Sequence, residues 1–210
     1  MNWNTGGVNE HYFTEHPSGE SELQEITVSL NSTEVSVLTA GGVFSPDHVD
    51  TGTRVLLDTL ADEPEVSGSV LDLGCGWGPI ALTAALRNPG AHIWAVDINS
   101  RARELARTNA QRLQLSNVSV AEPSEIDEGL RFAAIHSNPP IRVGKAALHE
   151  LLSQWLPRLE PGGAATLVVA KHLGAQSLLQ WITESFPDYA VSRIARDKGF
   201  FVIQAVRPSG

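Results

Sequence analysis

Hydrophobic positions recur along the chain at two spacings, and together they predict alternating strands and helices. The clearest helical spacing belongs to Leu148, Leu151, Leu152, Trp155 and Leu156, which fall on one face of a helix. Short β-branched runs between turn residues predict strands. We predict strands over residues 70–73, 92–96, 118–121, 132–136, 165–170, 190–195 and 200–206, and helices over 80–87, 101–113, 146–156 and 176–186.

This alternation predicts a mostly parallel sheet with helices on both faces. Only Asp197-Lys198-Gly199 joins the last two strands, which is too short for a parallel crossover, so they should form an antiparallel hairpin. Pro157 and then Pro161-Gly162-Gly163 should end the helix over 146–156. The fold class predicted is therefore α/β, with a Rossmann-like, seven-stranded, mostly parallel sheet that ends in an antiparallel hairpin.

The first 65 residues show a different pattern. Two β-leaning runs, 25–30 and 34–39, predict a short hairpin, and a helix over 55–60 should begin near Asp50 or Thr51. We expect one domain over residues 1–210. Within it, residues 1–65 form an N-terminal hairpin-and-helix lid, and residues 66–210 form the Rossmann-like core.

Composition narrows the class of protein. The 210 residues are 42% hydrophobic and 19% charged, which is typical of a folded globular chain. No apolar run approaches the roughly 18 residues of a membrane-spanning helix, and the N-terminus lacks a secretory pattern. The single Cys75 cannot form an intrachain disulfide, and no cysteine and histidine spacing indicates a metal site. We predict a soluble cytoplasmic protein without membrane or metal partners.

Charge is divided unevenly along the chain. The net charge is −9 overall, with −13 in residues 1–130 and +4 in residues 131–210. The overall sign argues against a protein covered in positive potential. The basic C-terminal part can still form a local patch that faces an anionic partner.

A glycine loop follows the strand over 70–73 and leads into the next helix. Its sequence is Asp72-Leu73-Gly74-Cys75-Gly76-Trp77-Gly78-Pro79, and such loops let the backbone approach a cofactor beyond the carboxyl ends of strands. A dinucleotide fingerprint has glycine where Pro79 stands, which disfavours an NAD dehydrogenase. Asp97 ends the next strand and is placed to accept hydrogen bonds from ribose hydroxyls, in either kind of nucleotide cofactor.

A second motif, Ser137-Asn138-Pro139-Pro140-Ile141, follows the fourth strand of the core. An asparagine oxygen and a backbone carbonyl can together accept both hydrogens of a base amine or an amide, and prolines stiffen the loop. Both motifs should meet at the carboxyl edge of the sheet. Methylation of cytosine C5 needs a Pro-Cys nucleophile, and the only cysteine lies in the glycine loop, so that chemistry is excluded.

Both motifs resemble known families. Asp-x-Gly-x-Gly-x-Gly resembles motif I of the class I S-adenosylmethionine-dependent methyltransferases, and Asn-Pro-Pro resembles the (Asp/Asn/Ser)-Pro-Pro-aromatic box of amino methyltransferases. The whole chain resembles the methyltransferase small domain group, and within it the ribosomal RNA small-subunit guanine-N2 methyltransferases. The segments that carry this resemblance are His11–Phe13, Gly42–Ser45, Asp50–Thr53, Asp72–Pro79, Ser137–Ile141, Gly144-Lys145 and Lys171–Gly174.

The resemblance implies an S-adenosyl-L-methionine cofactor and N-methylation of the exocyclic N2 amine of a guanine. The catalytic residues it implies are Asn138, Pro139 and Pro140. Its cofactor-binding residues are Phe44, Thr51, Gly52, Thr53, Asp72, Gly74, Gly76, Asp97, Glu122 and Asn138. The partner it implies is ribosomal RNA or the small ribosomal subunit, bound by a monomer or a weak homodimer. From their positive charge and their places after strands, we predict RNA contacts by Arg142, Lys145, Lys171 and His172.

Two features depart from the family pattern. Ile141 stands where the box usually has an aromatic residue, and the sequence shows no counterpart of the additional N-terminal domain of the classical bacterial enzyme. The alternatives are N-methylation of another RNA base or of a protein glutamine, and a non-catalytic RNA-binding assembly factor of the same fold.

Overall fold

A computed structural model of the protein describes residues 22–140 and 144–210. The segment His11–Phe13 and the residues Ile141 and Arg142 lie outside the described residues. The chain begins with strands β1 (Leu23–Leu30) and β2 (Thr33–Ala40) and helix α1 (Thr51–Ala61). The core then follows in the order β3 (Gly68–Leu73), α2 (Pro79–Arg87), β4 (Ala91–Val96), α3 (Ser100–Arg112), β5 (Val118–Ala121), η1 (Pro123–Glu125), β6 (Phe132–Ser137), α4 (Lys145–Trp155), η3 (Leu156–Arg158), β7 (Leu159–Ala170), η4 (Lys171–Leu173), α5 (Ala175–Ser185), β8 (Ala190–Asp197) and β9 (Phe200–Val206).

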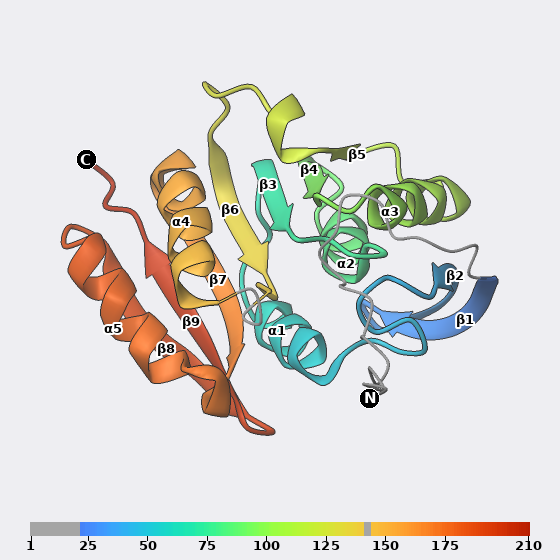
Figure 1. Ribbon diagram of the computed structural model, residues 1–210. Helices are drawn as coiled ribbons and strands as arrows, with labels where there is room; N and C mark the ends of the chain where they lie inside the picture. The colour runs from blue at the N-terminus through green and yellow to red at the C-terminus, as the bar shows by residue number, and fades with distance from the viewer. Residues whose placement is uncertain (1–21, 141–143) are drawn as a thin grey trace, which may run out of the picture.

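The central sheet has seven strands in the order β5-β4-β3-β6-β7-β9-β8 (Figure 1). The first five strands of this order are parallel, and β9 runs antiparallel to both β7 and β8. This confirms the predicted Rossmann-like sheet and its terminal hairpin. The carboxyl ends of β3, β6 and β7 point toward the bottom of Figure 1, where the predicted motifs should meet.

Helices cover both faces of the sheet, as predicted. Buried side chains of α4 and α5 pack on one face around Phe132 and Leu167. Those of α1, α2 and α3 belong to the clusters on the other face, around Val168, Val202 and Ile93. The sheet is therefore buried on both sides, which explains why its central strands are mostly apolar.

The N-terminal hairpin is a second sheet, packed against α2 and α3 through a cluster that contains Val37 and Trp77. Asn109 of α3 is fully buried and exchanges two hydrogen bonds with the backbone of Leu38 in β2, at 2.7 and 2.8 Å. Its amide also donates to the carbonyl of Trp77 at 3.0 Å. The hairpin is thus held firmly beside the glycine loop, while a role as a lid stays a prediction.

Strand β7 is longer than the predicted run over 165–170, because it includes Pro161-Gly162-Gly163. These residues pair with the end of the chain: Gly162 N donates to Arg207 O at 3.0 Å and Arg207 N to Gly163 O at 2.9 Å. A Cβ on Gly163 would lie 3.0 Å from the carbonyl oxygen of Phe132, so glycine permits the close approach of β6. The prolines and glycines therefore end the helix as expected and then continue as strand.

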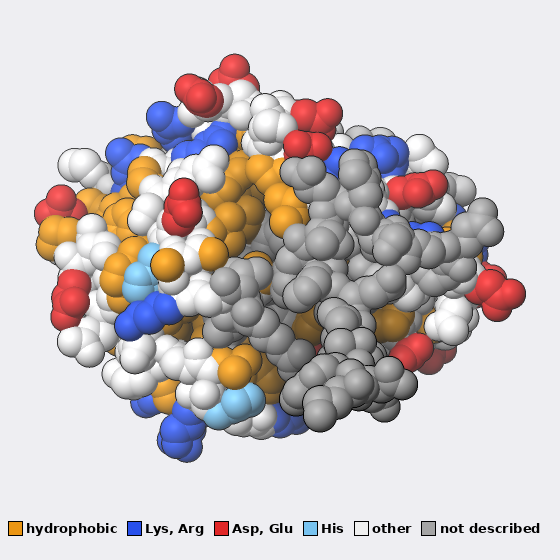
Figure 2. All heavy atoms as spheres, in the orientation of Figure 1, with side chains coloured by type: hydrophobic (Ala, Val, Ile, Leu, Met, Phe, Trp, Pro, Cys, Tyr) orange, Lys and Arg blue, Asp and Glu red, His pale blue; other side chains and the backbone are white. Residues whose placement is uncertain are grey.

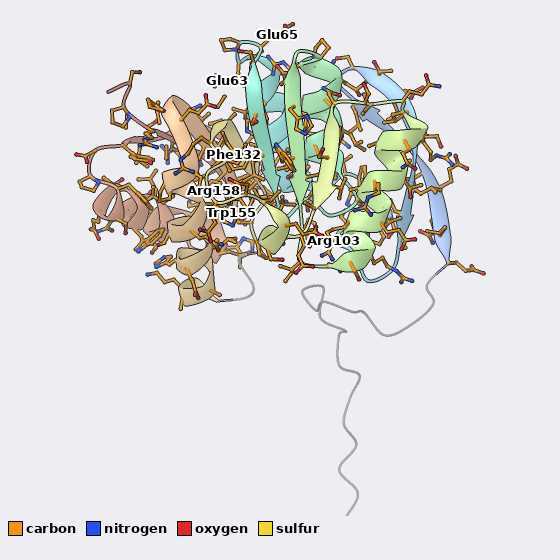
Figure 3. The ribbon with its side chains drawn as sticks, turned by 90° about the horizontal axis from the view of Figure 1, so that it is seen from above. Glu63, Glu65, Arg103, Phe132, Trp155 and Arg158 are labelled. Atoms are coloured by element: carbon orange, nitrogen blue, oxygen red, sulfur yellow. The ribbon has the colours of Figure 1, made fainter. Side chains whose placement is uncertain are left out.

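The turn between α4 and β7 is fixed by a buried cation. The guanidinium carbon of Arg158 lies 4.5 Å from the ring centroid of Trp155 and 5.4 Å from that of Phe132, and the three side chains lie together in Figure 3. Arg158 also donates to the carbonyls of Asp127 and Leu130. It therefore ties the segment before β6 to the end of α4.

Candidate active site

The glycine loop is anchored to the end of β4. The N–H groups of Gly74 and Cys75 both donate to the carbonyl of Val96, at 2.8 and 3.0 Å. Gly74, Gly76 and Gly78 all have positive φ, which L side chains rarely adopt. Among the described residues, nothing lies within 4 Å of a Cβ placed on Gly74, so none of them closes the backbone there to a ligand.

Asp97 follows β4 and is bound to this loop. Its two carboxylate oxygens accept hydrogen bonds from the backbone N–H groups of Gly76 and Asn99, each at 2.9 Å. Burial raises the pKa of Asp97, while these hydrogen bonds and the Arg103 guanidinium lower it. A carboxylate has about four acceptor positions, so Asp97 keeps capacity for ribose hydroxyls while it shapes the loop.

Asp72 lies beneath the loop, in the last part of β3. The side chain is buried, and one oxygen accepts a hydrogen bond from the backbone N–H of Ala81 in α2 at 2.9 Å. Its other oxygen is buried and has no hydrogen-bond partner among the described residues. Burial raises the pKa of Asp72 to about 8. Asp72 thus links β3 to the first turn of α2, and the expected contact with the methionine end of a cofactor stays a prediction.

The Asn-Pro-Pro motif leaves the sheet next to the glycine loop. The hydroxyl of Ser137, at the end of β6, donates to the carbonyl of Leu73 at 2.6 Å. Because Gly74 follows Leu73 directly, this bond brings Asn138 and the glycine loop to the same edge of the sheet. Pro139 is buried, and Asn138 and Pro140 are half-buried.

The side chain of Asn138 is held by the start of α1. Its Nδ2 donates to Asp50 Oδ2 and to Thr53 Oγ1, both at 3.0 Å. The same Asp50 oxygen accepts from the backbone N–H groups of Gly52 and Thr53, at 2.9 and 3.2 Å, and so caps the helix. The sequence predicts Asp50 as a helix start and misses its contact with Asn138, because the two residues are 88 positions apart.

Other predicted cofactor residues surround this edge. Phe44 lies in the loop after β2 and is 48% exposed, and Thr51 is exposed at the first position of α1. Glu122 follows β5 and forms a 3.1 Å ion pair with Arg103. One further residue was not predicted: Ile98 follows Asp97 directly and is 44% exposed, which places an apolar surface beside the carboxylate.

The described residues among those predicted to contact RNA are surface residues. Lys145 begins α4 after β6, while Lys171 and His172 form η4 after β7, and all three are exposed. The N–H of Lys171 donates to the carbonyl of Gly199 at 2.8 Å, so the turn of the terminal hairpin, with Lys198, reaches the same edge. Blue and pale blue side chains lie along the lower rim of Figure 2, near the end of β7 and the start of β9.

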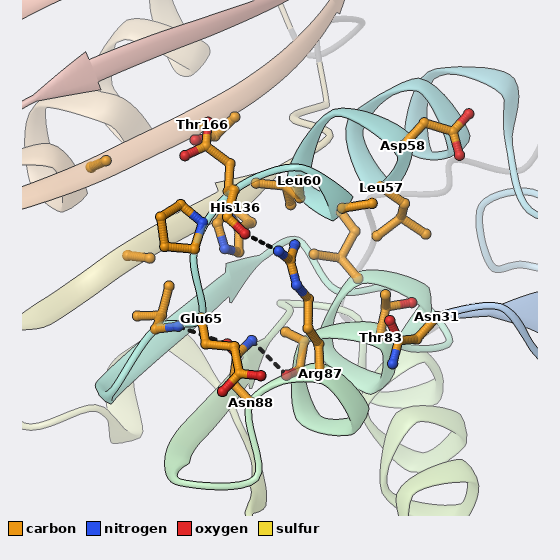
Figure 4. A pocket seen from close by; sticks show the side chains of 18 of the residues that line it. Asn31, Leu57, Asp58, Leu60, Glu65, Thr83, Arg87, Asn88, His136 and Thr166 are labelled. Carbon is orange, nitrogen blue, oxygen red and sulfur yellow. Dashed lines mark hydrogen bonds between the residues drawn. The ribbon is translucent and has the colours of Figure 1, made fainter.

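A cavity of about 540 Å³ lies elsewhere, between α1, α2 and the sheet. None of the described residues predicted for the site lines it. Arg87 and His136 face one another in it (Figure 4), and burial together with Arg87 lowers the pKa of His136 to about 4. The cavity is therefore lined by a neutral imidazole beside a fixed cation, away from the glycine loop.

Comparison with known proteins assigns the family. Residues 34–204 match the family described as "Methyltransferase small domain". The chain belongs to this family of methyltransferases.

Two relatives differ in how much of their own length this methyltransferase domain covers. The "Uncharacterized protein YbxB" of Bacillus subtilis is 36% identical over 201 residues, which is 94% of this chain and 98% of that protein. "Ribosomal RNA small subunit methyltransferase C" of Aeromonas hydrophila is 36% identical over 152 residues, 70% of this chain but 44% of that protein. The chain thus spans about half the length of such ribosomal RNA methyltransferases.

Solved structures share the fold. An N2 methyltransferase of 16S rRNA (RsmC) from T. thermophilus, solved in complex with AdoMet and guanosine, matches 88% of this chain and 50% of that one, with a TM-score of 0.73 and 24% identity. A ribosomal protein L11 methylase from Lactobacillus delbrueckii subsp. bulgaricus matches 77% of this chain and 84% of that one, with a TM-score of 0.63 and 17% identity. At these sequence identities, the two matches show that this chain shares the fold of those proteins.

Within the described residues, no helix is long and apolar enough to cross a membrane. The same residues contain no group of three or more His, Cys, Asp or Glu side chains placed to hold a metal ion.

Proposed function

We propose that this chain binds S-adenosylmethionine and methylates the exocyclic N2 amine of a guanine in small-subunit ribosomal RNA. The observation that carries the proposal is the position of Asn138 beside the glycine loop, with its amide nitrogen occupied by α1 and its oxygen left to accept. Relatives named as small-subunit ribosomal RNA methyltransferases support the choice of RNA as substrate.

The residues at this edge fit the cofactor. Asp97 offers carboxylate oxygens to ribose hydroxyls, and the exposed Ile98 offers an apolar surface to adenine. The loop at Gly74 is open for the methionine part. Bound S-adenosylmethionine supplies a methyl group already activated on a sulfonium.

The protein's task is then to hold the target amine. Asn138 Oδ1 and the Pro139 carbonyl accept its two hydrogens, which favours a nitrogen lone pair free to attack. With S-adenosylmethionine bound, the methyl carbon would pass from sulfur, which would keep the electron pair of the broken bond, to the amine nitrogen, and one amine proton would pass to water. Holding the reactants in this geometry can lower a barrier by up to about 7–11 kcal/mol.

The test is nucleoside mass spectrometry on ribosomal RNA from a strain that lacks the gene. Loss of one N2-methylguanosine, restored by the wild-type gene and not by one carrying Asn138→Ala, is the expected result. An unchanged N2-methylguanosine content with loss of another methylated base would contradict the guanine assignment. Unchanged methylation of ribosomal RNA would contradict RNA as the substrate.

A further inference from the structure

The hydrogen bonds between Asn138 and the first turn of α1 fix which end of the Asn138 amide faces the protein. Both hydrogens of the Asn138 amide are taken up, one by Asp50 Oδ2 and one by Thr53 Oγ1, each at 3.0 Å. Within residues 22–140 and 144–210, no group donates to Asn138 Oδ1. The amide nitrogen therefore faces the protein, and the oxygen is the part that remains for a ligand.

The carboxylate of Asp50 decides this orientation. An ionised carboxylate only accepts hydrogen bonds, so it cannot face the oxygen of the amide without repulsion. A threonine hydroxyl could accept or donate and would not choose between the two orientations alone. Asp50 is itself fixed, because the same oxygen accepts from the N–H groups of Gly52 and Thr53 as the cap of α1.

We infer that Asp50 and Thr53 are positioning residues for methyl transfer, which hold the Asn138 amide so that only its oxygen faces the target amine. This rests on the proposed function and makes it more specific. A free asparagine amide would present its NH₂ group as readily as its oxygen, and a donor facing an amine cannot bind its hydrogens. The hydrogen bond from Asn138 to a carboxylate also increases electron density on Oδ1, because hydrogen bonds in a chain polarise one another.

The inference changes the role expected for Thr53. The family resemblance groups Thr53 with cofactor-binding residues, but its side chain is buried and its hydroxyl accepts from Asn138. A substitution at Thr53 should therefore lower kcat and leave the affinity for S-adenosylmethionine unchanged. If Thr53 instead bound the cofactor, its substitution would weaken the affinity for S-adenosylmethionine.

Three variants separate positioning from helix capping. Thr53→Val removes one acceptor at nearly constant volume. Asp50→Ser keeps a good cap but is too short to reach Asn138. Asp50→Asn keeps an oxygen acceptor at the same reach, because the N–H groups of Gly52 and Thr53 would hold the amide oxygen, and not its NH₂ group, in the place of Asp50 Oδ2. Thr59→Val is the matched control, because Thr59 lies on the same helix and its hydroxyl donates only to the Val55 carbonyl at 2.7 Å.

The kinetic test uses small-subunit ribosomal RNA from a strain lacking the gene as substrate, with cofactor affinity measured by calorimetry and stability by urea unfolding. We expect kcat to fall roughly five- to tenfold in Thr53→Val and further in Asp50→Ser, as loss of one hydrogen bond and of a charged one implies. The kcat of Asp50→Asn should stay within about threefold of the wild-type value, and the kcat of Thr59→Val should equal the wild-type value. An Asp50→Asn variant as impaired as Asp50→Ser would overturn the inference, as would a weakened cofactor affinity in Thr53→Val with kcat intact.

A second measurement is independent of methyl transfer. The side-chain NH₂ signals of Asn138 are assigned by NMR from their loss in Asn138→Asp. They should be protected from hydrogen exchange in wild type, Asp50→Asn and Thr59→Val, and less protected in Asp50→Ser and Thr53→Val, each of which loses one of the two acceptors. Equal protection in all variants would overturn the positioning role. Protection as expected in a protein that does not methylate RNA would instead mean that the proposed substrate is wrong and the positioning is right.

Discussion

At the scale of single residues, the site depends on carboxylates that each have two tasks. Asp97 holds the glycine loop through Gly76 and the start of α3 through Asn99, and its remaining acceptor positions are the ones proposed to bind the cofactor. Asp50 caps α1 and orients Asn138. Because one side chain serves the fold and the ligand together, its substitution should be judged by affinity, activity and stability measured side by side.

Replacing Asp97 with alanine should weaken S-adenosylmethionine binding by roughly 10- to 100-fold. Two ribose hydroxyls lose a charged acceptor, worth about 1.5–3 kcal/mol. The N–H groups of Gly76 and Asn99 also lose their acceptor, so the free energy of unfolding should fall by about 1–3 kcal/mol. Calorimetric titration and urea unfolding measure the two effects, with Glu184→Ala, an exposed charge on α5, as control. Unchanged affinity in a folded variant would show that another residue binds the ribose.

Replacing Asn138 with alanine should remove most turnover and leave cofactor affinity nearly intact. Its amide contacts α1 and, in the proposed function, the target amine rather than the cofactor. Single-turnover methyl transfer with radiolabelled cofactor and saturating RNA measures the effect. Near-wild-type turnover would rule out Asn138 as the residue that holds the amine.

Asp72 should make the stability of the protein depend on pH. The pKa of this buried carboxyl is raised from 3.8 to about 8 in the folded protein. Between these values the unfolded chain has released the proton and the folded chain retains it, so the contribution of Asp72 to stability is fully present below pH 4 and is lost as the pH rises to 8. For a pKa difference of this size, the change in the free energy of unfolding has an upper limit of about 6 kcal/mol.

Asp72→Asn provides the comparison, because a neutral amide of the same shape cannot titrate. Urea unfolding at pH 4 to 8 without cofactor should show wild type losing stability relative to Asp72→Asn as the pH rises. The lowered pKa of His136 acts in both proteins and cancels in the difference. A difference that does not vary with pH would mean that Asp72 ionises normally in the folded state.

At the scale of secondary structure, the approach of α1 to β9 is set by a glycine. A Cβ on Gly52 would lie 2.8 Å from Cε1 of Phe200 and 3.0 Å from Asp50 Oδ2. Gly52→Ala should therefore destabilise the protein by about 1–3 kcal/mol through overpacking. Phe200→Leu should recover part of this loss in the double variant. Gly90→Ala is the control, since nothing lies within 4 Å of a Cβ there. Equal stability of Gly52→Ala and Gly90→Ala would show that α1 adjusts freely.

The elements were predictable where local patterns decide them. The helices over 80–87, 101–113, 146–156 and 176–186 are confirmed within about one residue at each end, because their apolar spacing and caps are local. β7 was predicted too short, because its first half is strand only through pairing with β6 and with Arg207 at the end of the chain. Proline and glycine preferences were overridden there by tertiary contacts.

The sequence predicts those parts of the candidate site that follow directly from strand order, and it does not predict the contacts between distant segments. The glycine loop, Asp97 and Asn138 follow strands whose carboxyl ends share one edge, so their convergence follows from the sheet alone. The contact of Asp50 with Asn138 and the docking of Asn109 on the N-terminal hairpin join segments 88 and 71 positions apart. No local pattern signals such pairs, and only the packed fold brings them together.

At the scale of the whole molecule, the net charge of −9 means that the proposed RNA substrate would meet only a restricted basic surface of the chain. Lys145 and Lys171 are exposed and begin the elements that follow β6 and β7, so both lie at the carboxyl edge of the sheet. Arg112 ends α3 and Arg131 precedes β6, so both lie at the opposite edge. If RNA binds at the carboxyl edge, the two pairs of cations should contribute very differently to its affinity.

Changing Lys145 and Lys171 together to alanine should make the dependence of RNA affinity on salt shallower by more than one unit of log–log slope. Each phosphate neutralised contributes a slope of about −0.7 to −0.9, so the loss of two contacts exceeds one unit. The Michaelis constant for RNA should rise, and cofactor affinity should stay unchanged, because neither lysine is among the residues proposed to bind the cofactor. Filter binding of ribosomal RNA across a salt series measures the slope, with the Arg112→Ala, Arg131→Ala double variant as a control of equal charge. An identical slope for the lysine variant and wild type would place the RNA on another surface. An equal change of slope in the control variant would mean that net charge alone, and not this edge of the sheet, explains the binding.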